Sequence, residues 1–327
     1  MFAFMRAVQI SRLDGPEAVE VVDIPEPDGD GKVVIDVAAA GVDFPIALQT
    51  RGLYQYKPNL PFVPGNEVAG VVRSAPEGSG FAAGDRVAAL TPFGGGLAEV
   101  VAVDAQSVFT IPESVELTSA AGLLFNDLTV HFALRTRAQL LDGETVLVHG
   151  AAGGIGTSTL RLAPLLGAAR TIAVVSTEEK AEVARANGAT DVVLTEGWLA
   201  AVKGLTGGRG VDVVVDPVGG DRFTDSLRSL ATGGRLLVIG FTGGEIPTVR
   251  VNRLLLNNID VRGVGWGAWL FTNPGSLRQQ WAEVEPLLAS GRLSAPKPIV
   301  RPVAEAAAAI ASLENRTAAG KVVLALR

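Results

Sequence analysis

Apolar residues follow two different patterns along the chain, one before residue 117 and one after it. The first part holds short Val-rich runs separated by Gly and Pro, at 33–42, 67–75, 84–90 and 96–112. Apolar runs bounded by turn residues predict strands. Because few helical patterns lie between them, the first part is predicted to be a small β-barrel-like domain.

From residue 145 onward, strand-like and helix-like segments alternate. The strands are predicted at 145–150, 171–176, 191–194, 211–218, 235–241 and 259–266. Nearly continuous Val/Ile/Leu strands that alternate with helices predict a parallel sheet covered on both faces, the doubly wound nucleotide-binding architecture. Pro164 falls inside the helix predicted after the first of these strands, where it would remove a backbone hydrogen bond.

Length and composition narrow the class of protein. A chain of 327 residues is long for one core and predicts two domains. With 48% apolar and 19% charged residues it is globular. A net charge of −6 without a run of basic residues argues against a nucleic-acid partner. The absence of cysteine excludes disulfides, thiolate metal sites and a cysteine nucleophile.

Targeting signals are not evident in the sequence. No apolar run approaches the roughly 20 residues of a membrane span, and the start of the chain lacks the basic and apolar pattern of a signal peptide. We therefore expect a soluble, cytoplasmic protein with no membrane partner.

The strongest local motif is the glycine loop after the first parallel strand. It reads Ala151-Ala152-Gly153-Gly154-Ile155-Gly156 between a strand and a helix. Glycines let the backbone approach a pyrophosphate, and the helix N-terminus supplies N–H donors. Ala151 replaces the first glycine of the usual fingerprint, and a tight strand-to-helix turn is the alternative interpretation. The strand-helix-strand context favours a dinucleotide site.

The end of the second parallel strand bears on which dinucleotide binds. NAD-binding folds usually place an acidic residue there, whereas this strand ends in Ser176 and Thr177, with Lys180 following. A hydroxyl and an ammonium group favour a 2′-phosphate, so NADPH is predicted over NADH. The alternative is that Lys180 lies on a solvated helix face beside Glu178 and Glu179.

Several blocks together resemble a known family, the zinc-independent quinone oxidoreductases related to zeta-crystallin within the medium-chain dehydrogenase/reductase superfamily. The blocks are AGVDFPIALQTRGLYQ (40–55), LPFVPGNEVAGVV (60–72), VHGAAGGIGT (148–157), GVDVVVDPVGG (210–220), GGRLLVIGF (233–241), IPTVRVNRLLLNNIDVRGVGWGAW (246–269) and NRTAAGKVVL (315–324). The resemblance implies an α/β fold with a GroES-like β-barrel catalytic domain and a Rossmann-type domain.

The resemblance also implies boundaries and an assembly. The catalytic domain would span 1–122, the NADP-binding domain 123–261, and a segment at 262–327 would complete the catalytic domain, with the active site in the cleft. Homodimers are usual in the family, so we expect one here.

The resemblance further assigns cofactor contacts. The loop at Gly153, Gly154 and Ile155 would hold the pyrophosphate. Other positions resemble contacts to the 2′-phosphate or the nicotinamide; they are Ser176, Lys180, Arg316, Phe241 and Val264. A tyrosine that often joins the 2′-phosphate site is absent, with Thr195 in its place.

On the substrate side, the resemblance places Asp43 and Tyr54 in the block that faces the nicotinamide, and Thr129 near the carboxamide. Asp43 often appears as Asn in quinone reductases, and an ionised carboxylate accepts hydrogen bonds but does not donate them. The alternatives are a loop-capping role for Asp43 and a pocket wall for Tyr54.

No metal site is predicted. Zinc alcohol dehydrogenases carry Gly-His-Glu at the block 63–72, and its histidine binds the metal, whereas this chain has Asn66 before Glu67. A catalytic zinc needs three protein ligands, and the two histidines, His131 and His149, align with no ligand position. We therefore read Glu67 as a structural carboxylate and both histidines as packed or loop residues.

Without a metal to polarise the acceptor, direct hydride transfer needs an acceptor that is already electron-poor. The sequence therefore predicts an NADPH-dependent reductase of a quinone or conjugated enone. Solvent can protonate the product anion, so a dedicated acid is not required, and Tyr54 is the nearest candidate for one. An enoyl-thioester reductase and a non-catalytic NADPH-binding sensor or structural protein are the alternatives.

Overall fold

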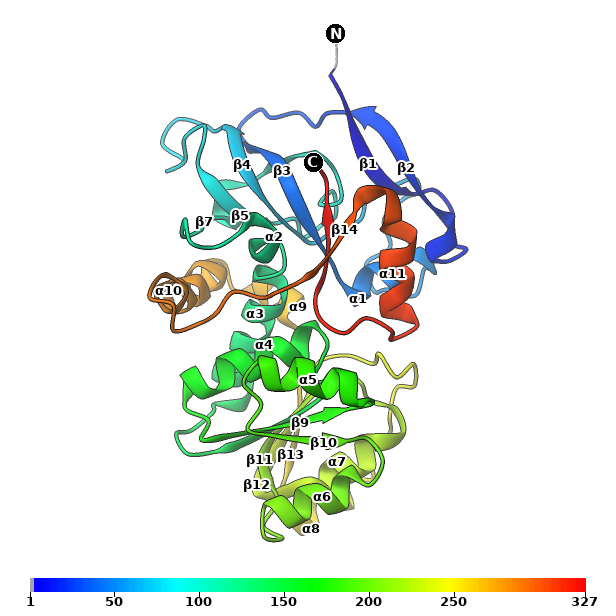
Figure 1. Cartoon of the computed structure of the whole chain (residues 1–327), viewed down its shortest axis with the longest axis vertical. Coiled ribbons are helices and arrows are strands. Elements are labelled where there is room, and N and C mark those ends of the chain that lie inside the picture. The colour runs from blue at the N-terminus through cyan, green and yellow to red at the C-terminus, as the bar shows by residue number, and fades with distance from the viewer. Residues whose placement is uncertain (1–2) are drawn as a thin grey trace. The chain divides into compact units, whose positions relative to one another are not determined.

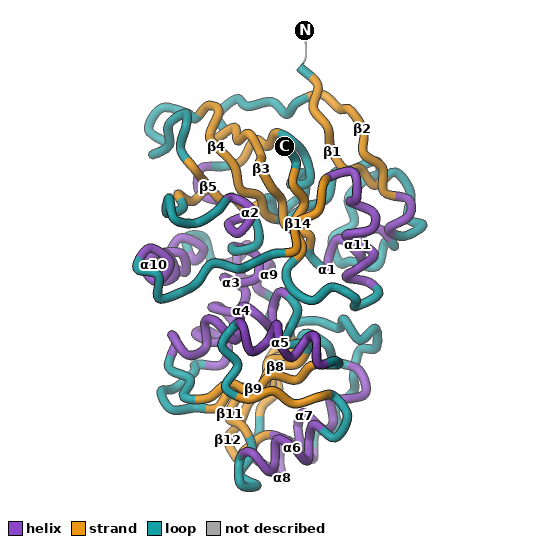
Figure 2. The backbone as a smooth tube through the Cα atoms, viewed as in Figure 1, coloured by secondary structure: helices purple, strands orange, loops and turns teal. Residues whose placement is uncertain are grey.

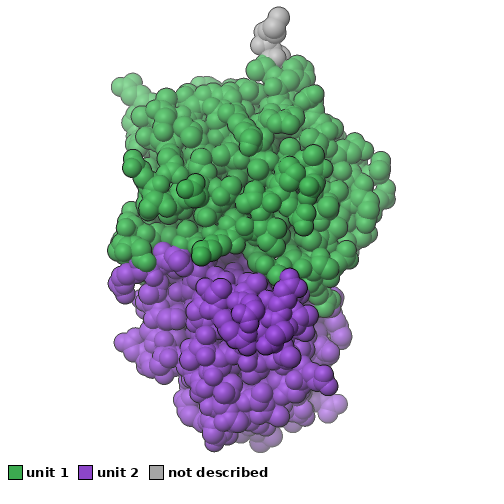
Figure 3. All heavy atoms as spheres, in the orientation of Figure 1, with its two compact units in different colours: residues 1–125, 281–291, 295–327 green, residues 126–280, 292–294 purple. Residues whose placement is uncertain are grey.

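The computed structural model describes residues 3–327, which divide into two compact units (Figures 1 and 3). Among the described residues, unit 1 comprises 3–125, 281–291 and 295–327, and unit 2 comprises 126–280 and 292–294. The domain boundaries predicted at 122 and 261 stay a prediction, and the compact units themselves divide at 125 and 280.

Unit 1 is built on a mostly antiparallel sheet, as the closely spaced Val-rich runs predict. Its strand order is β14-β15-β3-β4-β5-β7, with β6 paired to β3. Strands β1 and β2 form a separate hairpin (Figure 2). The strands are β1 (Phe4–Ile10), β2 (Val19–Pro25), β3 (Val33–Val42), β4 (Glu67–Ser74), β5 (Arg86–Leu90), β6 (Val100–Val103), β7 (Val108–Thr110), β14 (Ile299–Pro302) and β15 (Val322–Ala325). The alternating Val and Ala of β3 and β4 are buried in its core.

Short helices join and cover these strands. They are α1 (Phe44–Thr50), α2 (Leu117–Ala120), α11 (Ala306–Glu314) and the 3₁₀ turns Pro16–Ala18, Ala105–Ser107 and Val303–Glu305. The last strand, β15, pairs with β3 although the two lie at opposite ends of the chain. This pairing brings the residue before β15, Lys321, to the part of the sheet where β3 ends.

Unit 2 contains a six-stranded, fully parallel sheet in the order β10-β9-β8-β11-β12-β13. The strands are β8 (Thr145–His149), β9 (Arg170–Val175), β10 (Asp191–Leu194), β11 (Val211–Asp216), β12 (Leu230–Val238) and β13 (Asp260–Gly263). In chain order this is 3-2-1-4-5-6, the doubly wound dinucleotide-binding arrangement, which reverses direction between β8 and β11. The predicted fold class is confirmed.

Helices cover both faces of the parallel sheet, with α4 and α5 on one face and α6 and α7 on the other (Figure 1). The helices are α4 (Gly154–Leu162), α5 (Glu178–Ala186), α6 (Trp198–Leu205), α7 (Phe223–Ser229), α8 (Asn252–Asn257) and α9 (Trp266–Thr272). Two further helices, α3 (Leu124–His131) and α10 (Ser276–Ala289), run across the unit boundaries. A π-helix, Phe132–Ala138, continues α3.

The prediction that Pro164 lies inside an α-helix is wrong. Helix α4 ends at Leu162, and Pro164 lies in the first turn of a 3₁₀ segment, Ala163–Leu166, that ends at Gly167 with a φ of 113°. Proline lacks the N–H that a continuing α-helix would bond to the carbonyl four residues earlier, and α4 changes to the 3₁₀ turn where this bond is missing. Among residues 3–327, no helix combines the length and apolar content needed to cross a bilayer.

Candidate active site and cofactor site

The glycine loop connects β8 to α4 at the carboxyl edge of the parallel sheet. Gly150 has a φ of 58°, and the Gly153 N–H donates to the Gly150 carbonyl at 2.9 Å, which closes a tight turn. A Cβ on Gly156 would lie 2.4 Å from the Gly150 oxygen and from the Ala151 Cα. Gly156 therefore lets the first turn of α4 pack directly on the loop.

This loop has the features of a pyrophosphate site. Helix α4 begins at Gly154, so the N–H groups of its first turn have no acceptor within the helix and its dipole favours an anion. A Cβ on Gly153 would meet only the Gly150 oxygen, at 3.3 Å, so the loop surface is open at this position. Gly153, Gly154 and Ile155 lie together here and fit the diphosphate of a dinucleotide.

The second loop at this edge follows β11 and was missed by the sequence reasoning. Asp216 is buried, and its Oδ1 accepts from the N–H groups of Val218 and Gly219, each at 2.9 Å. Burial raises the pKa of Asp216, while these two N–H groups and Arg222 lower it less strongly. Val218 then contacts the glycine loop, because a Cβ on Gly150 would lie 3.2 Å from Val218 Cγ2. An Asp at a strand end before Pro-Val-Gly-Gly is the signal that identifies this turn.

The predicted 2′-phosphate residues of unit 2 lie after β9. Ser176 is exposed, and Thr177 caps α5 by accepting from the Lys180 N–H at 3.3 Å. Lys180 is half-buried on the first turn of α5. Glu178 forms an ion pair with Arg185 at 3.4 Å, so its charge is partly balanced by a group other than Lys180. The residue directly after β9 is Ser176, not an acidic residue.

Arg316, the third predicted phosphate contact, belongs to unit 1. It is exposed in the loop after α11, with a φ of 57°. Because Ser176 and Lys180 belong to unit 2, a shared phosphate site for all three residues stays a prediction.

The residues of unit 2 that are predicted to lie near the nicotinamide belong to different parts of the fold. Phe241 follows β12 and lies against Gly219, where an added Cβ would be 2.9 Å from the ring. Val264 follows β13, is buried, and donates its N–H to the Val238 carbonyl at 2.9 Å. Thr129 is buried on α3. Their contacts with a cofactor remain predictions.

In unit 1, Asp43 belongs to a buried ionic cluster. Lys321 Nζ donates to Asp43 Oδ1 and lies 2.6 Å from Glu67 Oε1. Glu67 Oε2 accepts from the Phe125 N–H at 2.9 Å. Exposed fractions are 5% for Asp43, 0% for Glu67 and 4% for Lys321, so bulk water does not screen these charges. Asp43 precedes α1 as its N-cap residue, and its side chain makes no cap hydrogen bond to that helix.

The cluster shifts the protonation of its members. Burial raises the pKa of Glu67 to about 7, Asp43 adds to the rise, and Lys321 and the Phe125 N–H oppose it. Burial alone would lower the pKa of Lys321, but the two carboxylates outweigh it and the pKa is raised. Tyr54 is half-buried; burial raises its pKa and the nearby Asp43 raises it further. Lys321, which the sequence reasoning missed, is a lone lysine before an apolar strand.

The side chains that could have bound a metal contact other groups of the protein instead. Glu67, read from sequence as a structural carboxylate, is bound to Lys321, and Asn66 offers only an amide. His149 is fully buried in unit 2, with Nε2 2.8 Å from Ser226 Oγ, and burial lowers its pKa to about 3. His131 is buried, with Nδ1 3.4 Å from Gln280 Nε2. Over residues 3–327, no group of three His, Cys, Asp or Glu converges on a metal position.

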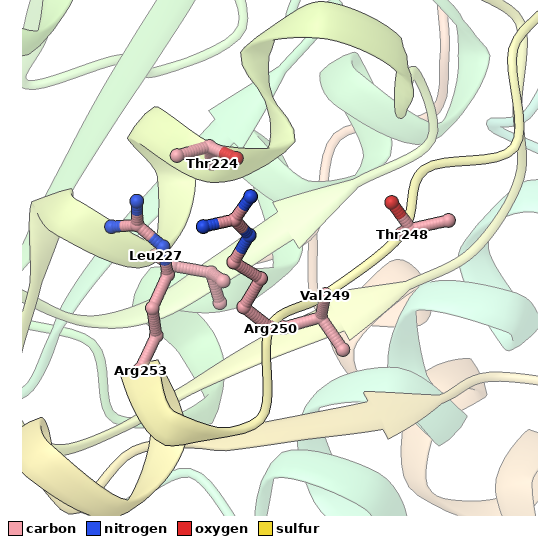
Figure 4. Close-up of a pocket in the computed structure, with 6 residues that line it drawn as sticks. All are labelled: Thr224, Leu227, Thr248, Val249, Arg250 and Arg253. Atoms are coloured by element: carbon pink, nitrogen blue, oxygen red, sulfur yellow. The ribbon is translucent and has the colours of Figure 1, made fainter.

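A small cavity of about 160 Å³ lies apart from the glycine loop, between α7 and the segment that leads into α8 (Figure 4). It is lined by Thr224, Leu227, Thr248, Val249, Arg250 and Arg253. Both arginine side chains extend toward α7. None of the predicted site residues lines this cavity.

Comparisons with known proteins agree with this architecture. Residues 29–113 match the family described as alcohol dehydrogenase GroES-like domain, and residues 154–290 match the family described as zinc-binding dehydrogenase. The chain is 42% identical over 267 residues to quinone oxidoreductase-like protein 2 of Rattus norvegicus, covering 81% of this chain and 76% of that protein.

Solved structures extend the likeness to nearly the whole chain. A probable oxidoreductase from Mycobacterium abscessus is 44% identical with a TM-score of 0.90, covering 99% of this chain and 100% of that one. The quinone oxidoreductase of Thermus thermophilus, also solved in complex with NADPH, is 37% identical with a TM-score of 0.83, covering 98% and 100%. The chain is an oxidoreductase that belongs to the zeta-crystallin-like quinone oxidoreductase family of the medium-chain dehydrogenase/reductase superfamily.

Proposed function

We propose that this chain is an NADPH-dependent reductase that transfers hydride directly, without zinc, to a quinone or a conjugated enone. The observation that carries the proposal is the pair of ionic contacts that Glu67 and Asp43 make with the Lys321 ammonium. Two carboxyl groups that could otherwise ligate a metal are thereby bound to an ammonium group, and Asn66 supplies no imidazole.

The cofactor side rests on residues of unit 2. When bound, NADPH supplies the hydride. The N–H groups at the start of α4, beside Gly153 and Gly154, bind the pyrophosphate. Ser176 and Lys180, with Arg316 from unit 1, bind the 2′-phosphate, and Phe241, Val264 and Thr129 position the nicotinamide ring.

The acceptor side rests on residues of unit 1. Without a Lewis acid, the acceptor must stabilise the negative charge that hydride addition creates, and quinones and conjugated enones delocalise it. Asp43 and Tyr54 face this acceptor. Because burial and Asp43 raise the pKa of Tyr54, its hydroxyl stays protonated at neutral pH and is able to donate a hydrogen bond to the product anion.

We also propose that the chain forms a homodimer through unit 2. Strand β13 is an edge strand of the parallel sheet, so one side of it has no strand partner among the described residues. The nearby α8 and the residue before it expose Val251, Leu255 and Leu256, each more than 70%. A self-complementary pairing of two copies would cover both features.

The test is oxidation of NADPH, followed by its near-ultraviolet absorbance, with a panel of small quinones and one enone. We expect rapid oxidation that a metal chelator does not slow, and slower oxidation of NADH. NADPH binding by fluorescence without oxidation of any acceptor would contradict the proposal and favour a narrower enoyl substrate or a non-catalytic role.

The cofactor preference has its own matched pair of variants. Lys180→Ala should lower the NADPH/NADH ratio of kcat/KM about tenfold, the effect of losing one charge-assisted hydrogen bond. Lys203→Ala removes an exposed lysine from α6 and should leave the ratio unchanged. Equal ratios in the two variants would exclude Lys180 from the phosphate site.

A further inference from the structure

The Asp43–Lys321–Glu67 cluster contains more acid than base. It brings together two carboxyl groups and one ammonium, all nearly inaccessible to water. If all three were ionised, unit 1 would bury a net negative charge, which costs several kcal/mol per uncompensated ion. One bound proton makes the cluster neutral. The geometry therefore favours a state in which the two carboxyl groups share one proton.

The fold leaves space specifically for this cluster. A Cβ on Gly41 would lie 2.6 Å from Glu67 Oε1, and a Cβ on Gly122 would lie 2.8 Å from Lys321 Cγ. Neither glycine has a positive φ, so their small size, not their backbone freedom, is what the structure uses. Replacing a buried ionic cluster with apolar side chains is often neutral or stabilising. Stability alone therefore does not account for these three groups.

Each carboxyl group of the cluster has one buried oxygen without a hydrogen-bond partner among the described residues, Asp43 Oδ2 and Glu67 Oε1. Glu67 Oε1 lies 2.6 Å from Lys321 Nζ and Glu67 Oε2 accepts from the Phe125 N–H, whereas Asp43 Oδ2 has neither kind of contact. The charged groups that influence Glu67 are Lys321 and Asp43, and those that influence Lys321 are Asp43 and Glu67. Asp43 also raises the pKa of Tyr54, which burial raises more strongly.

We propose that Asp43, Glu67 and Lys321 form a proton-holding unit that supplies the proton consumed when the acceptor is reduced. This rests on the proposed function, in which hydride delivers one hydrogen and two electrons and leaves the acceptor as an anion. In the resting form Glu67 carries the proton. In the donating form Asp43 carries it at Oδ2 and Glu67 is a carboxylate, while Lys321 contacts both groups and remains an ammonium throughout.

The proton balance closes within one turnover. Asp43 in the donating form gives its proton at Oδ2 to the product anion. The cluster is left with two carboxylates and one ammonium. It recovers one proton from solvent before the next hydride transfer, and no oxidant or reductant other than NADPH and the acceptor takes part.

The decisive variant is Glu67→Gln, which keeps the shape of the side chain but cannot hold the proton. General acid catalysis is worth about 100-fold or more, so we expect kcat to fall by about that factor. The change in kcat near pH 7 should disappear with it, and Glu67→Asp should restore part of both. Asp43→Asn, a second variant, should lower kcat similarly.

The matched control is Glu99→Gln, the same substitution at a glutamate of unit 1 whose carboxylate pairs with Arg6 at 2.7 Å. Its rate and pH profile should equal those of the wild type. If Glu67→Gln and Asp43→Asn, both folded, also keep the wild-type rate and pH profile, the proposal is wrong.

An infrared pH titration separates this proposal from the proposed function because it needs no turnover. The carbonyl band of a neutral carboxylic acid should titrate near pH 7 in the wild type and in Glu99→Gln, and be missing in Glu67→Gln. Absence of that band from the wild type would overturn the proton-holding unit, whatever the activity. A wild type that shows the band but reduces no quinone or enone would instead count against the proposed function and against the use of the proton.

Discussion

Glu67 shows at the scale of one residue how a buried charge makes stability depend on pH. Its pKa rises from 4.5 in the unfolded chain to about 7 in the folded one, chiefly by burial. The folded state therefore binds more protons between these values, and the free energy of unfolding that Glu67 contributes falls as pH rises through this window. The full contribution, about 3 kcal/mol, is present below pH 4.5 and lost above pH 7.

The prediction compares urea unfolding of the wild type and Glu67→Gln at a pH near 4.5 and at one above 7. The wild type should lose about 3 kcal/mol relative to the variant over this interval. Glu99→Gln is the control with the opposite sign, because Arg6 outweighs burial and lowers the pKa of Glu99. Parallel pH profiles for the wild type and Glu67→Gln would contradict the assignment.

At the scale of one element, helix α4 depends on a glycine in its first turn. Gly156→Ala would place a Cβ 2.4 Å from the Gly150 oxygen and the Ala151 Cα, both backbone atoms. The start of α4 would have to move away from the loop, so the N–H groups would no longer converge on the pyrophosphate. We expect NADPH affinity to fall at least about tenfold and stability to fall by about 1–3 kcal/mol, measured by fluorescence titration and urea unfolding.

Gly204→Ala is the matched control on another helix of the same sheet. Gly204 lies within α6, and a Cβ there would meet no atom within 4 Å. Alanine is about 0.5–1 kcal/mol more favourable than glycine in a helix, so this variant should be slightly more stable. NADPH affinity should not change. Equal effects of the two substitutions would show that the close approach at Gly156 does not matter for binding.

The elements that sequence predicted well are those with a clear apolar period. The six parallel strands and the glycine loop follow from Val-rich runs and a strand–glycine–helix motif. The sequence pattern did not predict the end of α4 at Leu162, because the α-helix continues directly into the 3₁₀ turn that contains Pro164. The π-helix at Phe132–Ala138 has the same apolar pattern as the helix it continues. Local patterns do not distinguish these hydrogen-bonding states.

At the scale of the whole molecule, the cluster of Asp43, Glu67 and Lys321 depends on contacts between distant segments. Asp43 and Lys321 are 278 positions apart, and the pairing of β15 with β3 brings them together. Sequence reasoning singled out Asp43 and Glu67 by motif but had no local signal for Lys321. The reason is physical: a lysine before an apolar strand is usually solvated, and only the long-range pairing shows that this one is buried.

Assembly is the other property of the whole molecule that surface chemistry predicts. Leu255 and Leu256 of α8 are 76% and 74% exposed, and β13 lies at the edge of the sheet. In a two-fold symmetric dimer each of these leucines is buried in both copies. Burying one such side chain stabilises the dimer by about 1.5–3 kcal/mol. Leu255→Asp with Leu256→Asp should therefore weaken dimerisation by about 100-fold or more, measured by sedimentation at several concentrations.

Leu141→Asp, which changes a 65% exposed leucine elsewhere in unit 2, should leave the dimer intact. A wild type that stays monomeric at all concentrations would rule out the dimer, and a dimer lost equally in both variants would rule out this surface, because a general increase in charge would then explain the loss.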